Sequence, residues 1–194
     1  MNFLQVWMSA DLQPSRAIEA LKEKRKPEWG FYGYVIRGVG TSIFYYVPSI
    51  LLGRQPGVPS YLVFWPTETY YYVLAFAFPV VSLGIWLLCG ALTHVALRFL
   101  GRPSEIDHIL NINGISWLVL GPVILSFDWF LILAFWEVDV YLWGLSHLLL
   151  DLWYLYLIAV GYKKILGLPY WLSVCLFMLQ MAASVPIAIL LLRD

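Results

Sequence analysis

Five ionisable side chains stand inside long apolar stretches of the chain, and their types could carry chemistry: Arg37, His94, Asp128, His147 and Asp151. An ionisable group in hydrocarbon costs free energy, so each should have a partner or a function. Imidazole and carboxyl groups can exchange protons, pair with each other or line the path of a substrate. No nucleophile motif, phosphate-binding glycine loop or zinc-ligand signature accompanies them. The sequence therefore predicts that the protein is not an enzyme.

Asp128, His147, Asp151 and Arg37 are predicted to form an intramembrane polar cluster. Counted along helices from the short connection between them, Asp128 and His147 lie at the same depth, roughly 10 to 12 Å from the nearer membrane surface. Asp151 follows His147 by one helical turn and shares its face. Arg37 is the one intramembrane cation available to neutralise these carboxylates, and its long side chain could reach Asp151.

Two interpretations of these polar residues stay open. Arg37 can instead extend to the headgroups while Asp128 points to the opposite interface, and then neither belongs to a site. If the groups do meet, they form either a structural hydrogen-bond network or a proton-sensitive or substrate-lining site. No metal is predicted, because zinc requires three or four ligands and His94 lies near the other surface. No cofactor is predicted either.

The elements that carry these residues are predicted to be membrane-spanning helices. Of the 194 residues, 61% are hydrophobic and only 12% are charged. Backbone amides cannot bond to water in lipid, and a helix needs about 20 residues to cross it, so long apolar runs predict helical spans. The runs cover residues 31–53, 71–97, 114–135, 139–161 and 171–192. The predicted fold is an all-α integral membrane protein, a five-helix transmembrane bundle.

Lysine and arginine predict the orientation of these spans, because both are retained on the cytoplasmic side. With the N-terminus inside, the inner segments hold Arg16, Lys22, Lys24, Arg25, Lys26, Arg98, Arg102, Lys163 and Lys164. The outer segments hold only Arg54 and Arg193. The pattern predicts a multi-pass protein with a cytoplasmic N-terminus and an outside C-terminus, in the cell membrane if the source is prokaryotic.

Aromatic side chains near both ends of the spans are predicted to anchor the membrane interfaces. The inner set is Trp29, Tyr32, Tyr162, Tyr170 and Trp171, and the outer set is Trp65, Tyr70, Trp136 and Tyr141.

Residues 1–30 are predicted to form a cytoplasmic lead-in to the transmembrane domain at 31–194. Pro14 can open a short amphipathic helix there. The apolar residues at helical spacing are Ala17, Ile18 and Leu21. We expect this helix at the inner membrane surface, either as an anchor in the headgroups or as a docking helix for a cytosolic protein. The basic residues that suit anionic lipid or an acidic partner are Arg16, Lys22, Lys24, Arg25 and Lys26.

The net charge and the cysteine content limit the classes of partner that the sequence predicts. The formal net charge is zero, so no overall positive field predicts binding to nucleic acid. Membrane lipid is the predicted partner, a cytosolic or membrane protein is a second, and an oligomer stays open. The two cysteines, Cys89 and Cys175, lie in apolar runs and are predicted to pack as small hydrophobes.

The chain resembles the Ypt-interacting protein (Yip) domain family of multi-span membrane proteins. The likeness is carried by three stretches, residues 11–21, 90–104 and 152–169, which share a pattern of hydrophobicity, glycine and proline with that family. The resemblance implies a compact five-helix membrane domain without catalysis and, in eukaryotic relatives, small GTPase partners. The chain lacks the family's Asp-Leu-Tyr-Gly-Pro motif and a long hydrophilic N-terminal region, and only Leu120-Gly-Pro echoes the motif. It is therefore similar to a prokaryotic-type member.

Two functions are predicted from these features. The first is a non-enzymatic membrane protein of the Yip-domain type that acts through inner-face contacts with a protein or lipid. The alternative is a small transporter or lipid-handling protein with a polar path at Asp128, His147 and Asp151. A water-filled cavity reaching Asp151 would favour the alternative, whereas a dry, tightly packed bundle with these groups paired to each other or to the backbone would count strongly against it.

Overall fold

The protein folds as a set of long helices. The structure, a computed structural model, describes residues 1–194 apart from 11, 24–26, 57–65, 136–139 and 192–194. The described part of the chain contains helices and turns but no strand, so the all-α prediction is confirmed. Among the described residues, three helical stretches are long and apolar enough to cross a membrane: Thr67–Phe99, Ile106–Ala134 and Tyr170–Ala188.

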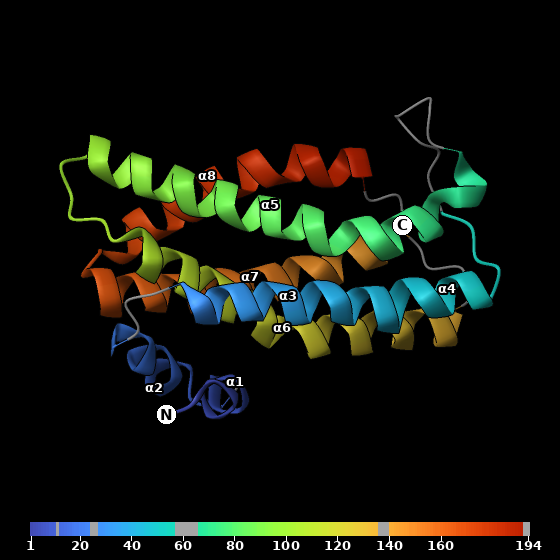
Figure 1. Ribbon diagram of the computed structural model, residues 1–194, viewed down its shortest axis with the longest axis horizontal. Helices are drawn as coiled ribbons and strands as arrows, with labels where there is room; N and C mark the ends of the chain where they lie inside the picture. The colour runs from blue at the N-terminus through green and yellow to red at the C-terminus, as the bar shows by residue number, and fades with distance from the viewer. Residues whose placement is uncertain (11, 24–26, 57–65, 136–139, 192–194) are drawn as a thin grey trace.

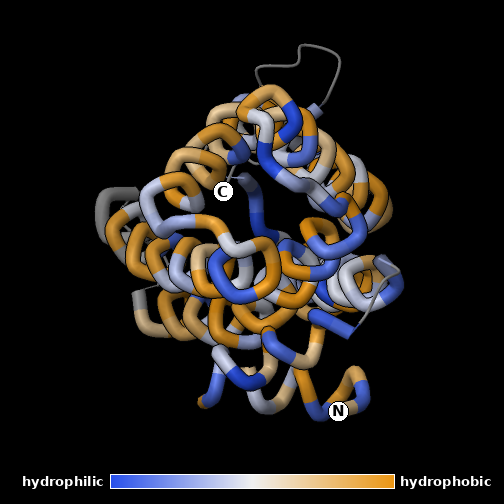
Figure 2. Tube along the Cα trace, turned by 90° about the vertical axis from the view of Figure 1, so that its left-hand side faces the viewer, coloured by the Kyte–Doolittle hydropathy of each residue, from blue (hydrophilic) through white to orange (hydrophobic). Residues whose placement is uncertain are grey.

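The long helices run side by side in alternating directions (Figure 1). They are α3 (Glu28–Thr41), continued by the π-helical η2 (Ser42–Tyr46) and by α4 (Val47–Leu51), then α5 (Tyr70–Phe99), α6 (Ile106–Phe135), α7 (Val140–Leu166) and α8 (Tyr170–Leu191), with η3 (Thr67–Thr69) before α5. Helix α3 packs on α5 and α6, and α8 packs on α5 and α7. Figure 2 looks along this bundle, with the N-terminal segment beneath it.

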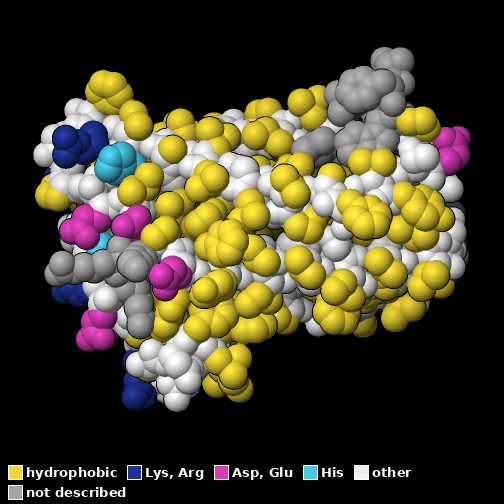
Figure 3. Space-filling model, in the orientation of Figure 1, with side chains coloured by type: hydrophobic (Ala, Val, Ile, Leu, Met, Phe, Trp, Pro, Cys, Tyr) yellow, Lys and Arg dark blue, Asp and Glu magenta, His cyan; other side chains and the backbone are white. Residues whose placement is uncertain are grey.

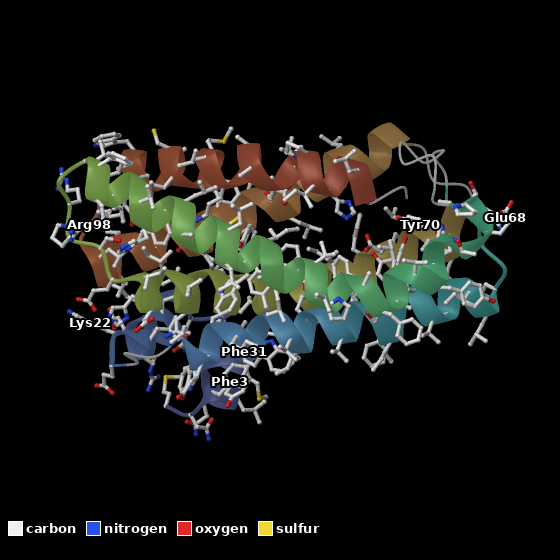
Figure 4. The ribbon with its side chains drawn as sticks, turned by 45° about the horizontal axis from the view of Figure 1, so that its top comes forward. Phe3, Lys22, Phe31, Glu68, Tyr70 and Arg98 are labelled. Carbon is white, nitrogen blue, oxygen red and sulfur yellow. The ribbon has the colours of Figure 1, made fainter. Side chains whose placement is uncertain are left out.

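Charged and apolar side chains are segregated along the bundle. A broad belt of apolar side chains covers its middle, and lysine and arginine gather at one end (Figure 3), which we call the charged end. Lys22 and Arg98 lie there, whereas Glu68 and Tyr70 lie at the opposite, far end (Figure 4). Large side chains such as Phe76, Val80 and Leu133 are exposed in the belt. An apolar belt of this extent is typical of a surface covered by lipid.

Two helices extend beyond the apolar runs that predicted them. Helix α6 begins at Ile106 instead of residue 114, and α7 ends at Leu166 instead of residue 161. The added turn of α6 contains Asn111, whose side-chain oxygen accepts a hydrogen bond from the Gly30 backbone N–H at 2.8 Å. Hydropathy misses these turns because they contain polar residues such as Asn111 and Lys164, which bond to other protein groups. The short connection predicted between the spans at 114–135 and 139–161 lies outside the described residues.

Glycines bring α3 and α6 into backbone contact. A methyl group on Gly114 would overlap the backbone of Gly30, and a methyl on Gly33 would lie 2.5 Å from the Gly114 carbonyl oxygen. Gly38 allows a similar approach on another face of α3, where an added methyl would lie 2.9 Å from the Pro79 Cα of α5. Small residues allow this approach in apolar surroundings, where packing rather than hydrophobic burial holds helices together.

The π-helical segment η2 precedes a proline. Pro48 has no backbone N–H, so the Phe44 carbonyl four residues earlier loses its usual donor. The Trp129 indole N–H of α6 donates to this carbonyl at 2.6 Å. The Trp129 side chain therefore satisfies the Phe44 carbonyl, which Pro48 leaves without its backbone donor. The same hydrogen bond connects α6 to the helical run from α3 to α4.

The N-terminal residues fold against the charged end of the bundle. Helix α1 (Phe3–Ala10), which the sequence reasoning missed, is followed by α2 (Pro14–Glu19) and η1 (Ala20–Glu23). Pro14 stands at the start of α2, as predicted. The predicted apolar residues Ala17, Ile18 and Leu21 are buried, and Ala17 and Leu21 belong to the main core cluster with residues of α6 and α7. This apolar face is covered by the bundle, so it is not free for headgroups or a partner.

Helix α1 also packs on α3 through aromatic rings. Phe3 meets the rings of Trp29 and Tyr32 at centroid distances of 5.9 and 6.0 Å. Figure 4 shows Phe3 beneath the first turns of α3. The opposite face of α1 exposes Leu4 and Met8. The lead-in is therefore joined to the bundle through the α1–α3 contact as well as through α2.

Several predicted interface anchors are instead core residues. Tyr162 and Tyr70 are fully buried, and Trp29 is buried in the main core cluster. The prediction failed because an aromatic residue at a span end can face the neighbouring helices as well as the lipid. Tyr32, Tyr170 and Trp171 are exposed. Trp65 and Trp136 lie outside the described residues, and the side chain of Tyr141 is not described.

Candidate functional site

A cavity of about 210 Å³ lies between α3, α5, α6, α7 and α8. Its walls are largely aromatic and aliphatic, and its polar lining residues are Ser82, Asp151, Gln180 and Ser184. At about 30 Å³ for each water in liquid, this volume exceeds what a single buried water needs and suits a small organic molecule. The cavity reaches Asp151, which is one part of what the transporter alternative requires, and its lining is mostly apolar.

Asp151 faces this cavity from α7. Within the described residues it makes no ion pair, and its nearest charged influence is His147, one turn earlier on the same helix. The prediction that Arg37 reaches Asp151 is not supported, because Arg37 packs on α6 instead. Asp151 is therefore a carboxyl group turned toward a cavity and not a member of a compact four-residue cluster.

Asp128 and His147 do meet between α6 and α7. The His147 Nε2 lies 3.3 Å from the Asp128 Oδ1, and the Asp128 side chain is only 9% exposed. The prediction that these two residues meet across the neighbouring helices is confirmed. The alternative in which Asp128 points to the interface is wrong, because the neighbouring helices bury its carboxylate.

Arg37 is buried in the bundle and does not extend to the headgroups. Its guanidinium carbon lies 5.0 Å from the centre of the Trp117 ring, and its side chain occupies the space that a Cβ on Gly121 would fill. Asp128 supplies the largest favourable charge that acts on it. The snorkelling alternative for Arg37 is therefore wrong, since Gly121 opens a place for the guanidinium inside the protein.

A buried hydrogen-bond network joins four helices on the charged-end side of the cavity. Gln180 of α8 donates to the Thr93 hydroxyl of α5 at 2.7 Å and to the Tyr162 hydroxyl of α7 at 2.8 Å. The Tyr162 hydroxyl donates to the Asn113 side-chain oxygen of α6 at 2.9 Å. Gln180 also lines the cavity, so the network forms part of its wall.

Sequence reasoning missed this network because it considered only ionisable side chains. A usable signal was present, since Asn111, Asn113 and Gln180 stand in predominantly apolar helices. Uncharged polar side chains in such helices commonly bond across to neighbouring helices.

Replacing Tyr162 with phenylalanine should lower the free energy of unfolding by about 1 to 2 kcal/mol, because Asn113 and Gln180 each lose a partner. Tyr156→Phe is the matched control, since Tyr156 lies on the same helix with an exposed side chain. Unfolding of both variants by SDS titration in detergent measures the difference. Equal stabilities would show that the Tyr162 hydroxyl contributes nothing to the bundle.

The charged end holds a second, more polar cavity of about 590 Å³, lined in part by Lys22, Ser104, Glu105 and His108. The His108 Nε2 lies 3.1 Å from the Glu105 carboxylate. His108 was not singled out in the sequence, because it stands outside the predicted third span. The His94 Nδ1, near the same end, lies 2.8 Å from the Ser104 hydroxyl.

The basic lead-in residues have different surroundings. Glu19 of α2 forms an ion pair with Lys164 at the end of α7. The hydrogen bond and the charge of Lys164 hold the pKa of Glu19 below its usual range. Arg16 contacts the Gln13 side chain at 3.5 Å, and Lys22 lines the polar cavity. The remaining basic residues of the predicted contact surface, Lys24, Arg25 and Lys26, lie outside the described residues.

Comparison of the chain with protein-family models, curated proteins and solved structures finds no significant match. The resemblance to the Yip-domain family therefore stays a prediction. Within the described residues, no three His, Cys, Asp or Glu side chains gather in an arrangement that could hold a metal ion.

Proposed function

We propose that this chain is a five-span integral membrane carrier that binds a small molecule in the cavity at Asp151. The N-terminus is cytoplasmic and the C-terminus lies outside. Five alternating long helical segments support the span count, including α7 and the uninterrupted run from α3 to α4. The distribution of lysine and arginine supports this orientation, because loops rich in these residues stay on the cytoplasmic side during membrane insertion. Lys22 and Arg98 lie at the charged end (Figure 4). Lys163 and Lys164 stand in the last turn of α7, Arg16 stands in α2, which packs on α7, and Arg102 follows α5. Arg54 follows the far end of α4.

The cavity carries the functional part of the proposal. Every long helical segment contributes to its lining, so tilting any helix changes its shape. Asp151 gives it a carboxyl group, and Gln180 connects it to the polar network toward the charged end. His147 lies one helical turn from Asp151 toward the far end of α7, and Asp128 of α6 pairs with it. Small-molecule sites are mostly apolar pockets with a few placed polar groups, and this cavity has both features.

The native cysteines provide the test. Cys89 is buried and lines the cavity, whereas Cys175 lies on the exposed face of α8. In the Cys175→Ala variant, Cys89 is the remaining thiol. N-ethylmaleimide reacts with the thiolate, which forms where water reaches the sulfur. We expect Cys89 to be alkylated in folded protein in liposomes, as measured by mass spectrometry, because a carrier cavity must open to water.

The reciprocal variant, Cys89→Ala, is the control for labelling at the lipid-facing Cys175. A Cys89 thiol that reacts only after denaturation, while the folded protein stays intact, would contradict the carrier proposal. Such a result means that the cavity never opens.

A second candidate is the inner-face contact protein that the sequence predicted. The observation in its favour is the outer face of α1, where Leu4 and Met8 are exposed, followed by Leu12. Leu4 and Met8 are four positions apart in α1, which places them on one helical face, and Leu12 is exposed beyond the end of that helix. An adaptor of this kind needs no water at Cys89, so the labelling experiment separates the two candidates.

A further inference from the structure

We propose that the cavity at Asp151 selects a small organic cation, an ammonium group with an apolar body. This inference rests on the proposed function and names the substrate class of the same site. Three features of the described lining residues support this selectivity. They present aromatic surface, they include one carboxyl group, and none of them is a lysine, arginine or histidine.

Aromatic rings from four helices form a continuous wall of this cavity. Tyr34 of α3 stacks on Trp117 of α6, with ring centroids 6.0 Å apart and an interplanar angle of 19°. Trp117 meets the ring of Tyr154 on α7 at 5.7 Å, and Tyr154 meets Phe177 on α8 at 5.5 Å. The face of an aromatic ring carries a partial negative charge and attracts a cation, most strongly where water is excluded.

The charges around the cavity leave Asp151 available to such a ligand. Arg37 lies against Gly121 with its guanidinium over the Trp117 ring. The rings of this wall that are left for a ligand are therefore those of Tyr34, Tyr154 and Phe177. Asp128 is the acid whose charge most favours Arg37. His147 pairs with the same Asp128. Among the described residues that line the cavity, Asp151 is the one acid, and no lysine, arginine or histidine faces it. A carboxylate in a mostly apolar space is stabilised by a counter-charge, and an entering ammonium group supplies one.

The chemistry of the walls separates an organic cation from a metal ion. Calcium and magnesium require six or more oxygen ligands, and the apolar lining cannot provide them. An ammonium group that bears carbon substituents needs little more than aromatic faces and one anion. Its apolar body can fill the remainder of the space of about 210 Å³.

Protection of Cys89 from alkylation tests this selectivity. The probes are phenyltrimethylammonium and tert-butylbenzene, which have the same shape and differ in charge. In the Cys175→Ala background, we expect phenyltrimethylammonium to slow alkylation of Cys89. Adding Asp151→Asn should raise its half-protecting concentration at least about tenfold, because cation–π contacts remain but the counter-charge is lost. The same substitution should leave protection by tert-butylbenzene nearly unchanged.

Each probe is compared with itself across variants, so its partition into lipid cancels. Glu68→Gln, an acid-to-amide change at the far end, is the matched control and should alter neither probe. If Asp151→Asn changes the two probes equally, or changes neither, cation selectivity is overturned while the carrier cavity stands. If Cys89 never reacts in the folded protein, the proposed function itself fails.

Discussion

Replacing Asp128 with leucine should lower the free energy of unfolding by about 3 kcal/mol or more, since it removes the buried ion-pair partner of His147 and the acid that most favours the buried Arg37 charge. Arg37 keeps its charge inside the bundle, and Asp128 supplies the largest favourable charge near it. His147 loses its partner at the same time. SDS titration of Asp128→Leu and of the parent protein in detergent measures the change.

A double-mutant cycle separates this charge effect from a general packing defect. Arg37→Met keeps much of the side-chain length over Trp117 and removes the charge. If the two charges stabilise each other, Asp128→Leu should cost clearly less in the Arg37→Met background, with a coupling of about 1 to 3 kcal/mol. Strictly additive losses would show that Arg37 does not depend on Asp128, and the assignment of this pair would be wrong.

The contact between α3 and α6 should not tolerate one added methyl group. In Gly114→Ala the added Cβ would overlap the backbone of Gly30. A backbone cannot move aside as a flexible side chain can, so the helices themselves would have to shift. Overpacking of this kind typically costs about 1 to 3 kcal/mol, and separation of the two helices would also disturb Arg37 and the cavity wall at Trp117. Thermal unfolding of the purified protein in detergent, followed by circular dichroism, checks the loss.

Gly84→Ala is the matched control for this substitution. Gly84 lies inside α5, and a Cβ added there meets no other atom within 4 Å. Because alanine is favoured over glycine in a helix by about 1 kcal/mol, Gly84→Ala should be neutral or stabilising. Similar midpoints for Gly114→Ala and Gly84→Ala would mean that α3 and α6 do not meet through their backbones.

The polar groups of the bundle are arranged along its length. The Asp128–His147 pair stands toward the far end, Asp151 lies at the cavity, and Gln180 and Tyr162 continue toward the charged end. Groups on both sides of the cavity are held by specific partners, whereas Asp151 faces open space. This difference is why we assign ligand contact to Asp151 and a positioning role to the neighbouring polar residues.

The sequence by itself determined the helical class and the positions at which polar side chains enter apolar helices. It also placed Asp128 opposite His147, because depth along a helix follows directly from residue number. Only the tertiary structure decided that Arg37 lies on Trp117, that Asp151 faces a cavity and that Tyr162 is buried. The physical reason is rotation about the helix axis. A helix that is apolar on every side has no preferred face in the sequence, so close contacts such as that of Gly30 with Gly114 select the face that turns inward.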